Sequence, residues 1–187
     1  MRVLWLAPVA PAAIVVAGPV AAHAAVYLSV EEATAAIFPG QTFTAAPYRL
    51  TDDERRAIEE ASGMQVRRPE IERWSAPGGA ALYRDRVLGK HEEIVYVLGV
   101  APDGAVAGVE ILEYRETYGG EIRRADWRQQ FLGRKAGQPL TLGGEIDNIS
   151  GATLSCRHVT DGIRRLLATH ATLAPAAGTP HVAAPGH

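Results

Sequence analysis

The chain has 187 residues, 47% of them hydrophobic, and its 19 basic and 21 acidic residues leave a formal net charge of −2. This length and composition predict one globular domain with a single core. The near-neutral balance supplies neither the basic surface that nucleic acid requires nor a polybasic patch for anionic lipid. Neither is expected as a partner.

Residues 1–24 have the pattern of an export signal. Arg2 is followed by an apolar run, and Ala22-His23-Ala24 has the A-x-A form that signal peptidase accepts. Prolines interrupt the run, which is shorter than the roughly 20 residues of a membrane-spanning helix. We predict a cleaved signal peptide and a periplasmic or otherwise extracytoplasmic mature protein. The alternative is an uncleaved membrane anchor.

The rest of the chain divides into a folded domain and a tail. Residues 25–170 are predicted to form the domain, and residues 171–187, rich in Ala, Pro, Gly and His, a disordered tail. The single cysteine, Cys156, cannot form an internal disulfide. We expect it to act as a small buried hydrophobic side chain.

Two short helices are predicted at the start of the domain. In "SVEEATAAIFPG", Ser29 and Glu32 have the spacing of a capping box, and in "TDDERRAIEEASG" Thr51 and Glu54 repeat that spacing. Gly63 is expected to end the second helix.

Strands follow between Trp74 and Tyr114. "AALYRDRV", residues 80–87, is the first predicted strand, and "EEIVYVLGV", residues 92–100, is a second that is rich in β-branched side chains. The turn at residues 101–104 contains Pro and Gly, and it should reverse the chain into "AVAGVEILEY". The last two strands therefore form a predicted hairpin.

Helical spacing returns after the hairpin. "RADWRQQFLG" places Trp127 and Phe131 on one face of a short helix. "QPLTLGGEI" is predicted to be a loop or an edge strand. The order of these elements predicts an α+β fold, an antiparallel sheet with helices packed against it.

The last predicted helix is "CRHVTDGIRRLLATHATL". Its Val159, Ile163, Leu166 and Leu167 recur at helical spacing and are expected to face the core, with the arginine pair at 164–165 on the opposite face.

The segment "DNISGATLSC", residues 147–156, lies immediately before this helix. Backbone N–H groups at a helix N-terminus bind anions, and phosphate is the expected ligand. The alternative is a purely structural role, in which Ser150, Thr153 or Ser155 is only the N-cap of the helix. Four residues alone do not separate these two interpretations.

The longer pattern Asp147-Asn148-Ile149-Ser150-Gly151-Ala152-Thr153 resembles the flavinylation motif of the FMN-binding domain family. That family includes one subunit of the sodium-translocating NADH:quinone oxidoreductase, its Rnf-complex counterpart and stand-alone exported flavinylated domains. "EYRETYGGEI" and "WRQQFLG" are similar to upstream segments of the family, and the likeness runs from about residue 92 to residue 170. Two positions depart from it: Tyr118 stands where many relatives have proline, and Cys156 where Ser or Thr is usual.

The resemblance implies which residues hold the cofactor. A flavin transferase would link the phosphate of FMN to the hydroxyl of Thr153 as a phosphoester. The neighbouring Ser150, Gly151, Ala152 and Ser155 would frame this position, and the transferase would recognise Asp147. The attachment loop would thus lie at the N-terminus of the last long helix.

Side chains upstream of the motif are candidates for contact with the flavin ring or its ribityl chain. Polar groups of Glu116 and Thr117 could bond to it, and Gly119 and Gly120 would permit close approach. The aromatic residues Tyr118, Trp127 and Phe131 could wall a pocket. For the aromatic residues, packing in the core is an equally good interpretation.

Three functions are compatible with a tethered flavin and no second cofactor motif. The first is an extracytoplasmic electron carrier that serves a membrane oxidoreductase or another redox protein. The second is an exported FMN-dependent reductase of a small substrate. The third is a non-redox binding module. We expect the carrier, because the sequence has no clear convergence of acid and base groups.

Overall fold

The computed structural model describes residues 25–174. The strands are β1 (Ala25–Val26), β2 (Thr44–Ala45), β3 (Tyr48–Arg49), β4 (Glu70–Ser75), β5 (Ala81–Leu88), β6 (Glu93–Val100) and β7 (Val106–Tyr114). The helices are α1 (Val30–Ile37), α2 (Asp52–Ser62), the 3-10 helix η1 (Gly120–Arg123), α3 (Ala125–Gln129) and α4 (Thr153–Leu173). The predicted export segment and residues 175–187 of the predicted tail lie outside the described residues.

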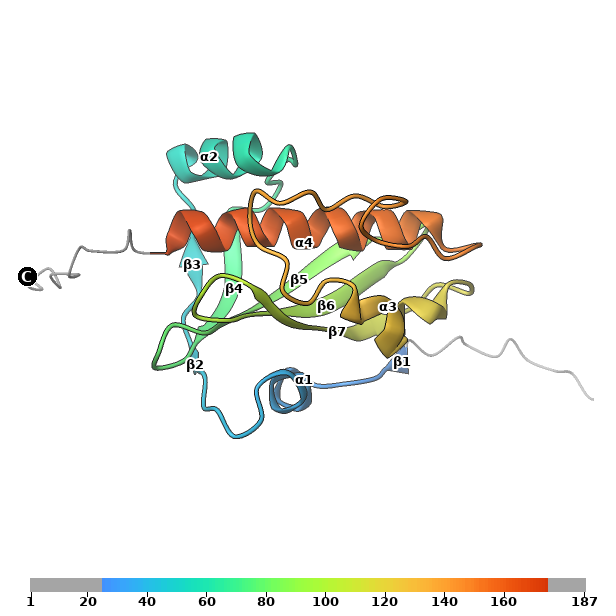
Figure 1. Cartoon of the computed structure of the whole chain (residues 1–187), viewed down its shortest axis with the longest axis horizontal. Helices are drawn as coiled ribbons and strands as arrows, with labels where there is room; N and C mark the ends of the chain where they lie inside the picture. Colours follow the sequence, from blue (N-terminus) through green and yellow to red (C-terminus); the bar gives the residue numbers. More distant parts are fainter. Residues whose placement is uncertain (1–24, 175–187) are drawn as a thin grey trace, which may run out of the picture.

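The strands form an antiparallel seven-stranded sheet in the order β1-β7-β6-β5-β4-β2, and β3 also pairs with β4. Helix α4 packs on β5 and β6 and is covered in turn by α2, whereas α1 lies on the other side of the sheet (Figure 1). This arrangement confirms the predicted α+β architecture. In the part of the chain that the structure describes, no helix is long and apolar enough to cross a membrane.

Strand β6 is buried on both faces because helices cover both sides of the sheet. Ile94, Tyr96 and Leu98 belong to the core under α4, whereas Val95 and Val97 face the core under α1. Alternation of side chains along a strand explains the division. The predicted β6–β7 hairpin is confirmed, with Leu98 paired to Val109 across it.

The first two helices begin as predicted. Ser29 and Glu32 form a reciprocal capping box at α1, and Thr51 and Glu54 form another at α2. Gly63 ends α2 in the left-handed conformation, at a φ of 68°. These signals are local, since each helix start depends only on residues three positions apart.

Strand β4 was not predicted, because its side chains pair with the neighbouring strand rather than forming an apolar run. Glu72 lies opposite Arg84 in the register and forms ion pairs with Arg84 and Arg86 of β5. Cross-strand pairs of opposite charge stabilise a sheet, but a single segment of sequence does not reveal them.

Helix α4 starts at Thr153, earlier than expected, and runs through Leu173, three residues into the predicted tail. Its expected core face is buried. The prediction that the arginine pair lies on the opposite face is wrong for Arg165, which bonds at 2.5 Å to Asp85 of β5. Tyr96 donates to the same carboxylate, so this half-buried charge has two partners.

The segment at residues 138–146 is a loop with one isolated bridge between Leu142 and Ile146, within the predicted alternatives. Trp127 and Phe131 pack edge to face with their centroids 5.1 Å apart. Cys156 is buried and free, as expected.

His170 links the end of α4 to the sheet. Its Nδ1 lies 2.9 Å from the hydroxyl of Tyr83, and both side chains are buried. Burial lowers the pKa of His170, and the charge of Arg73 lowers it further. Burial raises the pKa of Tyr83 to about 12, so its hydroxyl remains protonated and can donate to a neutral imidazole.

We predict that acid weakens the fold through His170. Below about pH 6.5, His170 binds a proton in the unfolded chain but stays neutral in the folded chain. The free energy of unfolding should therefore decrease as the pH is lowered, by at most about 1.4 kcal/mol per pH unit, until the lowered native pKa is reached. Denaturant unfolding between pH 7.5 and 5 measures this. His170→Gln should flatten the slope, whereas His91→Gln, an exposed control, should keep it. An unchanged slope in His170→Gln contradicts the assignment.

Candidate functional site

The segment at residues 147–152 forms the turn that leads into α4. Gly151 has a φ of 81°, a conformation that glycine adopts without strain. The backbone N–H of Ala152 donates to the carbonyl of Ile149 at 3.0 Å, and Cys156 closes the first helical bond to Ala152. The seven motif residues therefore end at the first residue of the helix, Thr153.

No side chain caps α4. Its N-cap is Ala152, which has no side-chain hydrogen bond to the helix, and its first turn contains no acidic residue. The alternative that Ser150, Thr153 or Ser155 is the N-cap is therefore wrong. The first backbone N–H groups of a helix have no partner within it, so this end of α4 has the polarity and the free donors that suit an anion.

Each hydroxyl of the segment has a different environment. The Thr153 side chain is exposed, and its Oγ1 accepts a bond of 3.1 Å from the Nδ2 of Asn148. Ser150 is also exposed. Ser155 is only 3% exposed and lies 3.3 Å from the hydroxyl of Tyr114.

Tyr114, at the end of β7, connects the loop at residues 115–120 with the start of α4. Its hydroxyl also donates to the carbonyl of Tyr118. Gly119 packs against the motif so closely that an added Cβ would lie 2.5 Å from the Cβ of Ala152 and 2.7 Å from the Tyr114 oxygen. The loop at residues 115–120 and the attachment turn are thus in direct contact.

Glu116 is tied to the turn between β5 and β6. Its Oε1 accepts from the backbone N–H groups of His91 at 2.5 Å and Glu92 at 3.0 Å. Partial burial raises the pKa of Glu116, but bonds from the backbone of His91, Glu92 and Lys90 together outweigh this effect and leave the pKa below its usual value. The carboxyl is therefore ionised at neutral pH and has no proton to donate.

The other upstream candidates differ in exposure. Thr117 is exposed, Gly120 is half-buried, and the Tyr118 side chain is 78% exposed. Phe131 is completely buried in the core. Only Tyr118 among the three candidate aromatic residues is placed on the open surface beside the motif.

Trp127 and Gln130 form hydrogen bonds with the backbone of Asp147, the first residue of the motif. The indole Nε1 donates to the carbonyl of Asp147 at 2.8 Å, and the Oε1 of Gln130 accepts from its backbone N–H at 2.8 Å. The Asp147 side chain is exposed. Sequence reasoning missed Gln130 and the role of Asn148, because neither position belongs to the motif's required residues.

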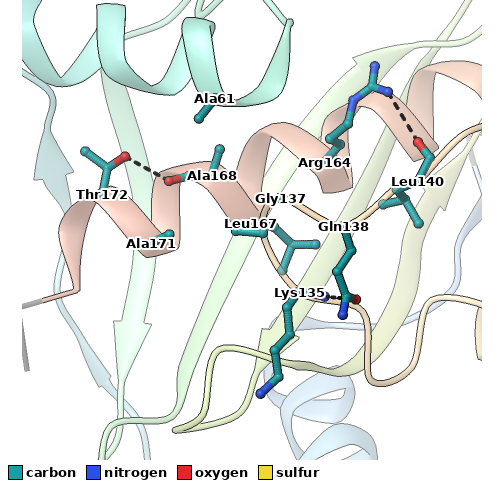
Figure 2. A pocket seen from close by; sticks show the side chains of 11 residues that line it. Ala61, Lys135, Gly137, Gln138, Leu140, Arg164, Leu167, Ala168, Ala171 and Thr172 are labelled. Atoms are coloured by element: carbon teal, nitrogen blue, oxygen red, sulfur yellow. Dashed lines mark hydrogen bonds between the residues drawn. The ribbon is translucent and has the colours of Figure 1, made fainter.

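Two cavities in the described part of the chain are relevant to the search for a site. One, of about 340 Å³, is open to solvent beside the motif and is lined by Glu121, Arg124, Asp126, Trp127, Gln130, Asp147 and Ile149. The second, of about 310 Å³, lies between α2, the loop at residues 135–140 and the C-terminal half of α4 (Figure 2). Lys135 there pairs with Asp103, and Arg164 pairs with Asp161. In residues 25–174, no cluster of three or more His, Cys, Asp or Glu could hold a metal ion.

An α+β domain that presents an exposed hydroxyl at an uncapped helix N-terminus, next to an open cavity, suits a phosphate-bearing cofactor. Residues 89–168 match the FMN-binding domain, close to the range expected from the resemblance. This part of the chain is therefore similar to the FMN-binding domain family, and the absence of an acidic residue or a side-chain cap at the start of α4 fits the phosphate of FMN.

The relatives that this chain resembles are components of oxidoreductase complexes. It is 31% identical over 100 residues to a subunit of the ion-translocating oxidoreductase complex of Erwinia tasmaniensis, covering 48% of each chain. It is 35% identical over 80 residues to the equivalent protein of Cereibacter sphaeroides, covering 37% of this chain and 36% of that one. A subunit of the Na⁺-translocating ferredoxin:NAD⁺ oxidoreductase complex of Acetobacterium woodii is 28% identical over 90 residues, or 43% of this chain and 44% of that one. The matched part is less than half the length of these relatives.

We predict that Gly119→Ala disrupts the contact between the two loops. Overpacking costs about 1–3 kcal/mol, and the φ of 86° adds about 1–2 kcal/mol for a residue with a Cβ. Gly151→Ala is the matched control, because its φ is 81° but no atom lies within 4 Å of the added carbon. Thermal and denaturant unfolding should show a greater loss of stability for Gly119→Ala. Equal losses contradict the described packing.

Proposed function

We propose that this protein is an extracytoplasmic electron-transfer flavoprotein, with FMN joined by a phosphoester to the hydroxyl of Thr153. The observation that carries the proposal is the coincidence of the seven-residue motif with an uncapped helix end. Thr153 is exposed at the first position of α4, and no acidic side chain lies in that turn. The positive N-terminus of a helix stabilises a phosphate group, both while the flavin nucleotide is being attached and once FMN is linked to the chain.

The transferase that performs the attachment must reach the motif. The backbone of Asp147 is held on both sides by Trp127 and Gln130, and its carboxylate is exposed. This geometry supports recognition of Asp147 by a flavin transferase. Ser150, Gly151 and Ala152 form the turn that brings this carboxylate and the Thr153 hydroxyl into one short segment.

The ring of the tethered flavin would lie close to the cavity beside the motif. Trp127 and Ile149 give that cavity apolar surface, and Gln130 and Asp147 give it polar groups. Bound there, FMN would supply a reversible acceptor and donor of electrons. Tyr118 and the exposed hydroxyl of Thr117 lie on the adjoining loop and could contact the ribityl chain or one edge of the ring.

An electron carrier is favoured over a reductase of a small substrate. Glu116, the acid in the loop next to the motif, is ionised and already bonded to the backbone of another turn. A reductase needs a proton donor within reach of its substrate, and this residue does not supply one. The partner of a carrier would be a membrane oxidoreductase or another redox protein, in agreement with the complexes to which the relatives belong.

The extracytoplasmic location is part of the proposal. It is supported by the export pattern of residues 1–24. Retention of these residues as a membrane anchor is the alternative, and it would leave the domain on the same side of the membrane.

Thr153→Ala should abolish covalent flavin in protein coexpressed with the transferase. The substitution removes an exposed hydroxyl that does not cap α4, so stability should change by no more than about 0.5 kcal/mol. Thr153→Ser, the control that keeps a hydroxyl, should retain the modification. Intact-mass measurement distinguishes them. An FMN increment on Thr153→Ala would move the attachment to Ser150 or Ser155, and no increment on the natural chain would favour a non-redox module.

The purified flavinylated protein, once reduced, should pass electrons to many acceptors with little selectivity. A carrier makes small and transient contacts, whereas an enzyme binds one transition state best and shows saturation. The measurement is the reoxidation rate with ferricyanide, cytochrome c, a soluble quinone and a series of small unsaturated acids. Saturating, multiple-turnover kinetics with one acid alone would overturn the carrier in favour of a reductase.

A further inference from the structure

Asn148 makes the one side-chain hydrogen bond to the Thr153 hydroxyl that the described residues show. It occupies the second position of the motif, which the family pattern leaves open. Its Nδ2 lies 3.1 Å from Oγ1, and both side chains are exposed. An amide nitrogen only donates, so Oγ1 must accept this bond.

The other threonines of α4 have a different hydrogen-bond pattern. Thr160, Thr169 and Thr172 each donate their hydroxyl proton to the carbonyl four residues earlier, at 2.7, 3.0 and 2.9 Å. This back-bonding is common for Thr within helices. Thr153 differs because it is the first residue of α4: its Oγ1 accepts from Asn148, and the described residues show no acceptor for its hydroxyl proton.

A hydroxyl has one proton and two lone pairs. The Asn148 amide occupies one lone pair and fixes the position of Oγ1 relative to the turn. The second lone pair and the proton are left for an incoming phosphorus and a base. Correct placement of reacting atoms is a large part of catalysis of a group transfer.

We propose that Asn148 is a positioning residue for flavin attachment, which holds the Thr153 oxygen toward the phosphorus of an activated flavin nucleotide. This inference rests on the proposed function of the same site. The group to be transferred must be a phosphoanhydride, since a phosphate monoester has no adequate leaving group. Flavin adenine dinucleotide (FAD) is a donor of this class.

The reaction balances without an oxidant or reductant. The O–H bond of Thr153 breaks and its proton passes to a base of the transferase, while a bond forms between Oγ1 and the phosphorus of the FMN half. The P–O bond of the pyrophosphate breaks, and AMP leaves. Asn148 takes no part in these bond changes, and it acts only through the position of Oγ1.

The test is a time course of intact mass for the full apo chain, mixed with purified flavin transferase, Mg²⁺ and FAD. At saturating apo chain, Asn148→Ala should lower the turnover rate about fivefold, the change that corresponds to about 1 kcal/mol of one net hydrogen bond. The apo-chain concentration that gives half the maximal rate should change little. Asn148→Asp, which keeps the shape but loses the donor, should lose at least as much.

Gln129→Ala is the matched control, because it removes another exposed amide from the neighbouring helix α3; it should be modified at the natural rate. Thermal unfolding of each variant checks that the fold is intact. Modification of Asn148→Ala at the natural rate, or a change confined to the half-saturating concentration, overturns the positioning role. If the natural chain itself is not modified, the proposed function fails as well, so the two failures are distinguishable.

Discussion

Burial of one face of α4 against β5 and β6 is the interaction on which the rest of the structure depends. Val159 and Ile163 are completely buried in the core beneath this helix, and the bond from Arg165 to Asp85 fixes the helix to the sheet. Burying a side chain of this size stabilises a fold by about 1.5–3 kcal/mol. The same packing sets where the first turn of α4, and therefore Thr153, meets the solvent.

Two aromatic residues complete the geometry at that end of the helix. Tyr114 joins β7, the neighbouring loop and Ser155 through one hydroxyl, and Trp127 holds the backbone of Asp147 through its indole N–H. Both rings are buried while their polar atoms are bonded, as buried Tyr and Trp require. The buried core thus presents a turn at which Asp147, Ser150 and Thr153 are exposed to solvent.

Features set by neighbouring residues were predictable from the sequence. The capping boxes at Ser29 and Thr51 depend on residues three apart, and the β6–β7 hairpin on a short turn with Pro and Gly. The motif itself is contiguous, so its resemblance to the FMN-binding family could be recognised without a structure. These predictions needed no knowledge of which elements pack together.

The missed features depend on contacts between distant segments. Strand β4 is held to β5 by pairs such as Glu72 with Arg84. The side chain of Arg165 points toward the sheet because it forms an ion pair with Asp85 of β5. The absence of a cap at α4 could not be predicted either, since three hydroxyls stood at suitable positions in the sequence. Asn148 was overlooked for a similar reason, because only the structure shows that its side chain points toward the Thr153 hydroxyl.

Peptide mapping of the coexpressed protein tests the central claim most directly. Trypsin cleaves after Lys135 and Arg157, so the whole motif lies in the single peptide of residues 136–157. The account predicts that this peptide carries an FMN increment after denaturation and that fragmentation places it on Thr153. Loss of all flavin on denaturation, or an increment on any other residue, would contradict covalent attachment at the start of α4.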